Sequence, residues 1–247
     1  MKISALLGFF IAIVAIITSH EIEGGNLQSL INLPALIVVC CGTLGAVMVE
    51  TPFPILLEAI SLCGWIIVPP YNNIKETSAK MLMWSFTARK DGLLGLEKLI
   101  EVEKDVFAKK GLELLVSGTE SFVIKDILES AMNQRERKKE LAASVFESMG
   151  GYAPTIGILG AVLGLIHVMS NLNDPSKLGG GIAAAFVATL YGVGLANIVF
   201  LPLGARFQKL IQQECNHSEM IIEGILAISQ GFNPHLVECK MLNYTDS

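Results

Sequence analysis

Residues Gly150–Ser170 read GGYAPTIGILGAVLGLIHVMS, and residues Gly179–Pro202 read GGGIAAAFVATLYGVGLANIVFLP. Each stretch is long enough to cross a bilayer as a helix, which takes about 20 apolar residues, and neither contains Asp, Glu, Lys or Arg. Small residues recur in both at helical spacing: Gly157, Gly160, Ala161 and Gly164, then Ala185, Ala188, Gly192 and Ala196. Such stripes let helix backbones approach closely in lipid. The sequence therefore predicts two closely packed membrane helices, for which ordinary helix packing is the simplest explanation.

Composition supports a membrane protein. Hydrophobic residues make up 52% of the chain and charged residues 17%, and the mean hydropathy is +0.55. These values are typical of integral membrane proteins. The net charge of -5 gives no reason to expect nucleic acid as a partner. The five cysteines show neither CxxC nor His/Cys metal spacing, so we interpret them as reduced packing residues and expect no metal site.

The N-terminal region, residues 1–50, is predicted to form a transmembrane hairpin. Two apolar runs, Ile3–Ser19 and Ile31–Val49, are separated by a short polar turn. A signal peptide is the alternative for the first run, but no small-x-small cleavage site follows it. Residues 51–70 begin with two prolines that end the second helix. The apolar run that follows is too short to cross a bilayer and is interpreted as an interfacial helix along the membrane surface, or as an elbow.

Residues 71–149 carry charges of both signs and are predicted to be a helical cytoplasmic domain, with breaks near Gly92, Gly111 and Ser117–Gly118. The mixed-charge run 135–140 is interpreted as a solvated helix face that continues into the third span. Residues 150–202 then supply the third and fourth spans. Residues 203–247 form an amphipathic helix to about Ser229 and a shorter helix from Pro234.

The predicted fold class is therefore an all-α integral membrane protein with four transmembrane helices. A large helical domain lies between the second and third spans, and a helical tail follows the fourth. Basic residues lie near the span ends at Lys2, at 135–139, and at Arg206 and Lys209. By the positive-inside rule, both termini and the large loop are expected to be cytoplasmic.

Catalytic patterns are missing from the sequence: it has no serine–histidine–acid set, no HExxH and no glycine-rich phosphate loop, so we do not expect an enzyme. Gly179–Gly181 is interpreted as a turn. The only ionisable side chain within a span is His167, near the outer end of the third, and an interfacial role suits it best. Glu50 is expected in the headgroup region. If the chain helps to conduct ions, the titrating carboxylate must come from another polypeptide.

The polar residues of the last two spans are chiefly Thr155, Thr189, Tyr191 and Asn197. Hydroxyl groups in membrane helices usually bond to their own backbone; alternatively, Thr155 and Thr189 line a hydrated path. Pro154 is expected in the first turn of the third span, where proline is tolerated. Pro202 is expected to end the fourth span. Either proline is also a candidate hinge.

Several motifs resemble the MotA family of flagellar motor stator subunits. Tyr152–Gly157 with Leu159–Ile166 resembles the family's third-helix motif. Ala185–Gly192 with Ala196–Asn197 and Pro202 resembles the fourth-helix motif, and the segment Ala88–Glu97 resembles the cytoplasmic loop. The likeness extends over essentially the whole chain.

The resemblance implies a homo-oligomeric ring, a pentamer in the family, around two helices of MotB in the bacterial cytoplasmic membrane. MotB would supply the ion-binding aspartate and a peptidoglycan anchor, and the cytoplasmic domains would push the rotor protein FliG. The resemblance assigns rotor contact to Arg89 and Glu97 and conformational roles to Pro154 and Pro202. The residues expected to line the ion path and the partner helix are Pro154, Thr155, Gly157, Ala161, Thr189 and Gly192.

The coupling ion follows from one position of the third helix. Sodium-type relatives carry a threonine where this chain has Ala161, beside a fourth-helix threonine that corresponds to Thr189. Because sodium needs several oxygen ligands, the missing hydroxyl favours protons, with no other cofactor.

Three alternatives remain. An ExbB/TolQ-like energy-transducing subunit has three spans, so the additional N-terminal helix argues against it. A small-solute secondary transporter often shows internal repeats, which are not visible here. A passive membrane scaffold would need no ion path.

Overall fold

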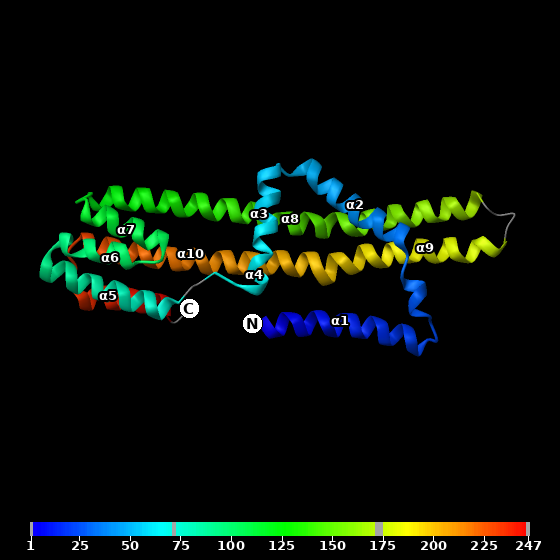
Figure 1. Ribbon diagram of the computed structural model, residues 1–247, viewed down its shortest axis with the longest axis horizontal. Helices are drawn as coiled ribbons and strands as arrows, with labels where there is room; N and C mark the ends of the chain where they lie inside the picture. The colour runs from blue at the N-terminus through cyan, green and yellow to red at the C-terminus, as the bar shows by residue number, and fades with distance from the viewer. Residues whose placement is uncertain (1, 71–72, 171–174, 246–247) are drawn as a thin grey trace. The chain divides into compact units, whose positions relative to one another are not determined.

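The computed structural model describes residues 2–70, 73–170 and 175–245, which form helices joined by short turns (Figure 1). No strand occurs within these ranges, and the predicted all-α class is confirmed. The chain divides into two compact units: unit 1 comprises Met1–Val68 and Glu140–Gln208, and unit 2 comprises Pro69–Lys139 and Lys209–Ser247.

Unit 1 contains the apolar helices. They are α1 (Lys2–Ile22), η1 (Leu27–Leu30), α2 (Leu33–Glu50), α3 (Phe53–Leu62), α4 (Gly64–Ile67), the later part of α8 (Ser121–Ser170), α9 (Pro175–Gly194), the π-helical η3 (Leu195–Phe200) and the start of α10 (Leu201–Ser229). The apolar segment at residues 55–68 was expected to form one helix. It forms parts of two, α3 and α4, which are separated by a turn at Cys63.

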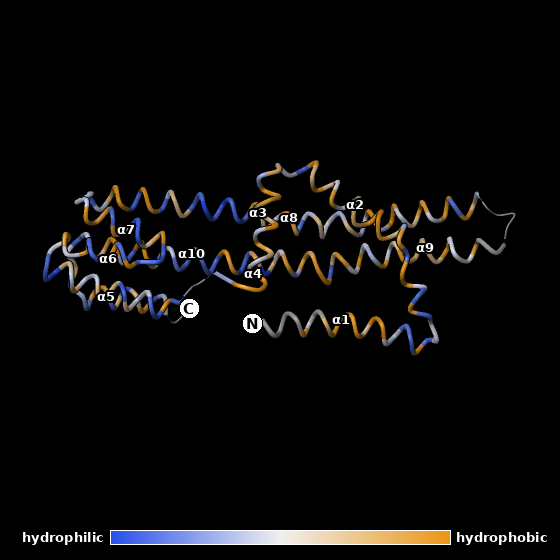
Figure 2. The backbone as a smooth tube through the Cα atoms, in the orientation of Figure 1, coloured by the Kyte–Doolittle hydropathy of each residue, from blue (hydrophilic) through white to orange (hydrophobic). Residues whose placement is uncertain are grey.

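Three segments among the described residues are long and apolar enough to cross a membrane: Leu27–Glu50, Ser121–Ser170 and Leu178–Ser229. The apolar character of α2 and α9 is visible in Figure 2. Helix α1 is 21 residues long and contributes a shorter apolar stretch, Phe10–Ile22, to this search. Three of the four predicted spans are therefore found by this criterion.

Local sequence explains where α2 begins and ends. The Asn32 side chain accepts a hydrogen bond from the Ala35 amide at 3.0 Å and so caps the helix N-terminus. Pro34 occupies the first turn, where its missing N–H costs nothing. Thr51 is extended and precedes Pro52, so the helix stops there as predicted.

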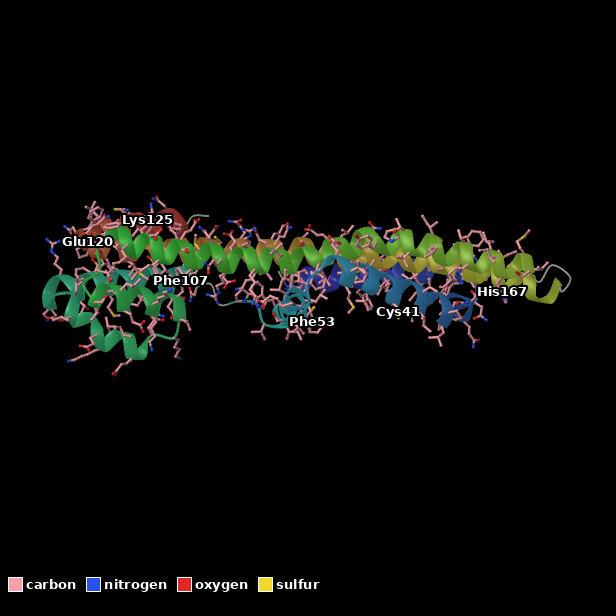
Figure 3. All side chains as sticks on the ribbon, turned by 90° about the horizontal axis from the view of Figure 1, so that it is seen from above. Cys41, Phe53, Phe107, Glu120, Lys125 and His167 are labelled. Atoms are coloured by element: carbon pink, nitrogen blue, oxygen red, sulfur yellow. The ribbon has the colours of Figure 1, made fainter. Side chains whose placement is uncertain are left out.

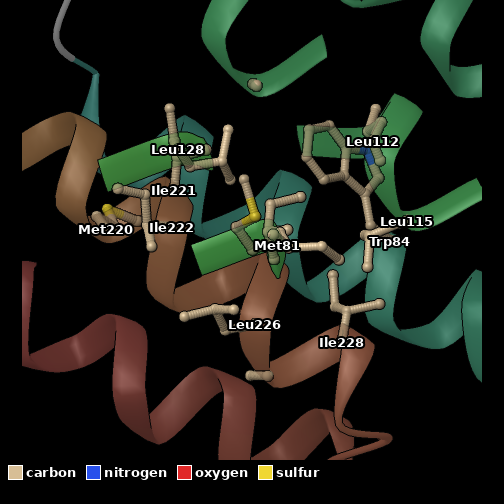
Figure 4. Packing of buried hydrophobic residues seen from close by; sticks show 14 of the residues in the cluster. Met81, Trp84, Leu112, Leu115, Leu128, Met220, Ile221, Ile222, Leu226 and Ile228 are labelled. Atoms are coloured by element: carbon tan, nitrogen blue, oxygen red, sulfur yellow. The ribbon is translucent and has the colours of Figure 1, made fainter. Parts of the chain in front are cut away.

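Unit 2 is a helical bundle around an apolar core. It contains α5 (Ile74–Asp91), η2 (Leu93–Leu96), α6 (Glu97–Val102), α7 (Val106–Val116), the first part of α8, the later part of α10 and α11 (Pro234–Thr245). Trp84, Met81 and Leu112 are almost completely buried where these helices meet (Figure 4). Burying each such side chain contributes about 1.5–3 kcal/mol, so the apolar stripes of the helices hold the bundle together.

Two of the three predicted breaks in residues 71–149 are confirmed. Gly92 and Gly118 have φ of 73° and 70°, which favours glycine, and they follow α5 and α7. The prediction for Gly111 is wrong because this residue lies inside α7 and is buried. A Cβ there would lie 2.9 Å from the Ile225 side chain. Gly111 therefore permits close packing against α10 and does not interrupt the helix.

The C-terminal prediction is confirmed: α10 ends at Ser229, Gly231 has φ of 72°, and α11 begins at Pro234. The glycine run at 179–181 is different. All three glycines lie inside α9, so the expected turn is wrong. A Cβ on Gly181 would meet the Val168 side chain, which means that glycine here allows α8 and α9 to approach.

Helices α8 and α10 continue without a break through residues 149–150 and 202–203, where the sequence suggested domain boundaries. The observed unit boundaries also lie inside these helices, after Lys139 and after Gln208. The prediction that the charged run 135–140 continues into the third span is confirmed, since α8 extends from Ser121 to Ser170.

Candidate functional site

The two small-residue stripes pack against each other within one chain. Gly157 on α8 and Gly192 on α9 are buried, and a Cβ added to Gly192 would lie 2.9 Å from the Gly157 Cα and 2.5 Å from the Ala153 carbonyl oxygen. Further along, a Cβ on Gly164 would lie 3.1 Å from that of Ala185. The backbones are in direct contact over this length, as small residues permit in a membrane. Gly157 and Gly192 therefore set the distance between α8 and α9.

Ala161 and Thr189 lie beside this contact. Each follows a residue of the interface, Gly160 and Ala188, and a Cβ on Gly160 would lie 3.0 Å from that of Ala188. One step along a helix turns a side chain by about 100°, which places both residues at one level on the side of the α8–α9 pair away from α2. Both are half-buried. The two positions on which the prediction of the coupling ion depends therefore lie side by side.

The side chains of Thr155, Thr189 and Asn197 bond to their own helices. Thr155 Oγ1 donates to the Tyr152 carbonyl at 2.8 Å, and Thr189 Oγ1 lies 3.5 Å from the Ala185 carbonyl. Asn197 Nδ2 donates to the Val193 carbonyl at 2.9 Å. The prediction of bonding to the helix backbone is confirmed. Thr155 is exposed, so its oxygen remains accessible to a partner or to water as an acceptor.

Neither proline occupies the place expected from the sequence. Pro154 lies inside the 50-residue helix α8 and not in a first turn. Pro202 is the second residue of α10 and does not end the helix. The segment before Pro202 is the π-helical η3, where the Leu201 amide donates to the Ala196 carbonyl five residues earlier. A wider turn accommodates a residue that has no N–H and would clash with a regular helix.

Tyr191 makes the longest-range hydrogen bonds of unit 1. Its hydroxyl donates to the Leu30 carbonyl at 2.5 Å and accepts from the Asn32 amide at 3.2 Å. Sequence reasoning identified Tyr191 as a polar residue of the fourth span but could not identify its partners, which are backbone groups 159–161 residues away. The sequence indicated only that a tyrosine lies within a span, where a phenol hydroxyl usually has a hydrogen-bond partner.

Glu50 ends α2 and receives two hydrogen bonds from α8. The Tyr152 hydroxyl donates to it at 3.1 Å and the Ser148 hydroxyl at 3.4 Å. His167 lies in the last turn of α8 and is exposed (Figure 3). A groove of ≈ 510 Å³ beside it is bordered by α2, α8 and α9. Its glycine-rich lining results from the same small-residue stripes.

Arg89 and Glu97 lie in unit 2, at neighbouring helix ends. Arg89 belongs to the last turn of α5, Glu97 begins α6, and the turn at Gly92 separates them. Both side chains are exposed, and the interactions found in the described part of the chain include no ion pair for either. Leu93 and Leu96 pack into the core of unit 2 and fix this turn. The two charges thus lie on the surface of unit 2 on either side of a packed turn.

The charged run 135–140 is only partly solvated. Lys139 is 9% exposed, and its Nζ donates to Glu214 Oε1 at 2.6 Å. Arg135 lies 3.4 Å from the same carboxylate. The expectation of a solvated face is wrong for Lys139 because α10 lies along this part of α8 and supplies Glu214. Burial of a charge requires such a pair.

His217 is a second buried ionisable residue of unit 2. Its Nε2 lies 2.8 Å from the Thr77 hydroxyl, and its Nδ1 lies 4.0 Å from an Asp105 carboxylate oxygen. Burial lowers the pKa of His217, and the neighbouring Asp105 opposes this shift only in part. Nearby, burial opposes the charge on Lys80, but the carboxylates of Glu103 and Glu76 outweigh it and raise the pKa of that lysine.

Within the described ranges, no three His, Cys, Asp or Glu side chains form a group that could hold a metal ion. None of the five cysteines, all of which lie in the described part of the chain, forms a disulfide bond. Only Cys215 is buried, so the interpretation as a packing residue holds for it, whereas Cys41, Cys63 and Cys239 are exposed.

Comparison with known proteins places this arrangement in a family. The model of the MotA/TolQ/ExbB proton channel family matches residues 100–220. Over 245 residues the chain is 33% identical to Motility protein A of Bacillus subtilis, covering 99% of this chain and 91% of that protein. It is 32% identical to Motility protein A of Helicobacter pylori, with 99% and 95% covered. The chain therefore belongs to the MotA/TolQ/ExbB proton channel family, which is not a family of enzymes.

Solved structures point to one branch of this family. The fold matches the solved structure of C. jejuni MotAB with a TM-score of 0.92 and 29% identity, covering 99% of this chain and 96% of that one. It also matches the flagellar MotAB stator complex of Bacillus subtilis, with a TM-score of 0.87, 32% identity, and 97% and 94% covered. The resemblance of the sequence motifs to MotA is confirmed.

Proposed function

We propose that this chain is the ring-forming stator subunit of a bacterial flagellar motor and converts ion flow into torque on the rotor. The observation that carries the proposal is similarity over the full length. The chain is 33% identical to Motility protein A of Bacillus subtilis over 99% of its residues, and the fold matches MotAB with a TM-score of 0.92. A relative that shared only the channel segment would not match in the cytoplasmic unit as well.

The subunit works with MotB, which supplies the ion-binding aspartate and the peptidoglycan anchor. Residues 150–170 and 179–202 contain no carboxylate of their own, so a proton-binding group must be brought in. The side of the α8–α9 pair away from α2 is apolar and exposed; Ile158 and Val162 on α8 and Phe186 and Val193 on α9 are 46–73% exposed. This face, together with Pro154, Thr155, Ala161 and Thr189, surrounds the partner helix in a homo-oligomer, which we assign as a pentamer.

The coupling ion is the proton. Ala161 offers no oxygen at the level where Thr189 has a hydroxyl, and the Thr189 hydroxyl itself is directed to the Ala185 carbonyl. Too few oxygen ligands remain in this chain for a sodium site, whereas a proton passes along water to a single carboxylate. No other cofactor is involved.

The chain lies in the bacterial cytoplasmic membrane with four spans and with both termini inside the cell. Helix α1 is the fourth span, since its 21 residues suffice to cross a bilayer. Unit 2 is cytoplasmic, where Arg89 and Glu97 contact the rotor protein FliG. Pro154 and Pro202 are the conformational prolines, and the π-helical turn before Pro202 supports this role because such turns are frequent at functional sites.

The test is the swimming speed of a flagellated cell that lacks its own stator and expresses this chain with its co-encoded single-span partner. Swimming in sodium-free medium that a protonophore stops supports both the stator and the proton. Swimming only with sodium overturns the ion assignment and leaves the stator function. Failure to turn a matched rotor, with both proteins inserted, overturns the stator function.

A further inference from the structure

The contact between α8 and α9 fixes their distance, and because only glycine fits at its closest points it also limits the rotation of either helix. It consists of backbone and small side chains, with Gly157, Gly192 and Ala188 in the closest approach. Such a surface offers few directional interactions of its own. A hydrogen bond from α9 to a neighbouring element adds an interaction that depends on the direction in which each α9 residue faces.

The Tyr191 hydroxyl makes such hydrogen bonds. It bonds to two backbone groups of the α1–α2 connection, the Leu30 carbonyl at 2.5 Å and the Asn32 amide at 3.2 Å. Leu30 ends η1 and Asn32 precedes α2. Both groups lie outside the α-helices, at the end of a 3-10 helix and at a helix cap, and unpaired backbone groups are costly in a membrane. The hydroxyl satisfies both, which ties α9 to the start of α2.

We propose that Tyr191 is a positioning residue that fixes the rotation of α9 and thereby the direction in which Thr189 faces the ion path. Tyr191 and Thr189 are two residues apart, so their side chains leave the helix about 200° apart. Holding Tyr191 on α2 therefore directs Thr189 to the opposite side, away from α2. Ala35 and Val39 of α2 pack against Val187 and Ala188, so the hydroxyl acts where the two helices already touch.

This role rests on the proposed stator function, and the test separates the two. The variant is Tyr191→Phe, which keeps the ring and removes both hydrogen bonds. The matched control is Tyr244→Phe on α11, where the hydroxyl has no hydrogen bond among the described residues. Both are made in the full chain and assembled with its partner in membranes.

Two measurements are made on each variant. Hydrogen exchange of the Asn32 amide in the purified complex is expected to accelerate at least tenfold in Tyr191→Phe, while the Ala35 amide, bonded to the Asn32 side chain, stays protected. The torque added by each stator unit, measured as discrete speed steps of a rotating bead, is expected to fall at least twofold. A purely structural role would change the number of units engaged but not the step height.

Unchanged exchange at Asn32, or lost protection with a normal step height, would overturn the positioning role. Equal effects of Tyr244→Phe would overturn it as well. If the wild-type chain gave no speed steps, the stator function would be refuted, and with it the torque role of Tyr191. The exchange comparison would still report on the two hydrogen bonds.

Discussion

Replacing Gly192 by alanine is expected to force α8 and α9 apart, whereas the same change two residues later should be harmless. The added methyl group at 192 would lie 2.5 Å from the Ala153 carbonyl oxygen and 2.9 Å from the Gly157 Cα. Both obstacles are backbone atoms, which no side-chain rotation can remove. At Gly194, nothing lies within 4 Å of the added methyl group.

The magnitude follows from these distances. Ordinary contact begins at about 3.4 Å, so the helices must separate by about 1 Å, which forfeits up to half of the dispersion energy of the contacts involved. Overpacking of this kind costs about 1–3 kcal/mol, and rigid obstacles favour the upper end. The higher helix propensity of alanine relative to glycine stabilises the variant by about 1 kcal/mol. We expect Gly192→Ala to destabilise by about 2 kcal/mol and Gly194→Ala to stabilise by up to about 1 kcal/mol.

The assay is thermal unfolding of the detergent-solubilised complex, followed by circular dichroism. For a chain of this size, 1 kcal/mol corresponds to about 2–4 °C, so the midpoints of the two variants should differ by about 6–12 °C. Motility should fall with Gly192→Ala and persist with Gly194→Ala. Equal midpoints, or a larger loss at Gly194, would refute the conclusion that direct backbone contact sets the α8–α9 distance.

Three further predictions concern unit 2. Glu214→Gln should lower the free energy of unfolding by about 3 kcal/mol because it removes the carboxylate that pairs with the buried Lys139. The double variant Glu214→Leu with Lys139→Met should lose clearly less stability in thermal unfolding. Equal losses in the two variants would argue against the importance of the ion pair. Because burial lowers the pKa of His217, the folded state binds this proton less readily than the unfolded state, so stability should be complete above about pH 6.5 and fall as the pH decreases below it. His217→Gln should flatten this decline between pH 7 and pH 5, and an unaltered decline would assign the effect to other groups. Arg89→Glu or Glu97→Arg should lower torque while changing the free energy of unfolding by no more than about 0.5 kcal/mol, since both residues are exposed; a larger change would show that these charges support the fold.

Most elements of the fold could be predicted because their signals are local. The apolar runs predicted α1, α2 and the spans within α8 and α9. Gly92, Gly118 and Pro234 correctly predicted turns. Two of the errors share one cause. Gly111 and Gly181 lie inside helices at points where a Cβ would meet the side chain of a neighbouring helix, and only the tertiary structure reveals that neighbour. A Cβ on Gly179 or Gly180 would meet nothing within 4 Å.

In the candidate site, too, some features could be predicted from the sequence and others could not. The resemblance to the MotA family implied that Ala161 and Thr189 lie beside each other, and the contact of their neighbours Gly160 and Ala188 places them at one level. The partners of Tyr191 and the burial of Lys139 were not predictable, because each depends on a residue at least 75 positions away.

By itself, the sequence determined that this chain is helical, that it contains membrane-spanning segments without their own carboxylate, and that small residues line two of them. Hydrophobicity and helical periodicity are properties of a single segment, so they can be read without knowing its neighbours. Only the tertiary structure decided that the glycine stripes face each other, that helices continue past Pro154 and Pro202, and that Tyr191 ties α9 to α2. These features depend on which backbone groups and side chains meet, and that is set by packing between segments distant in the chain.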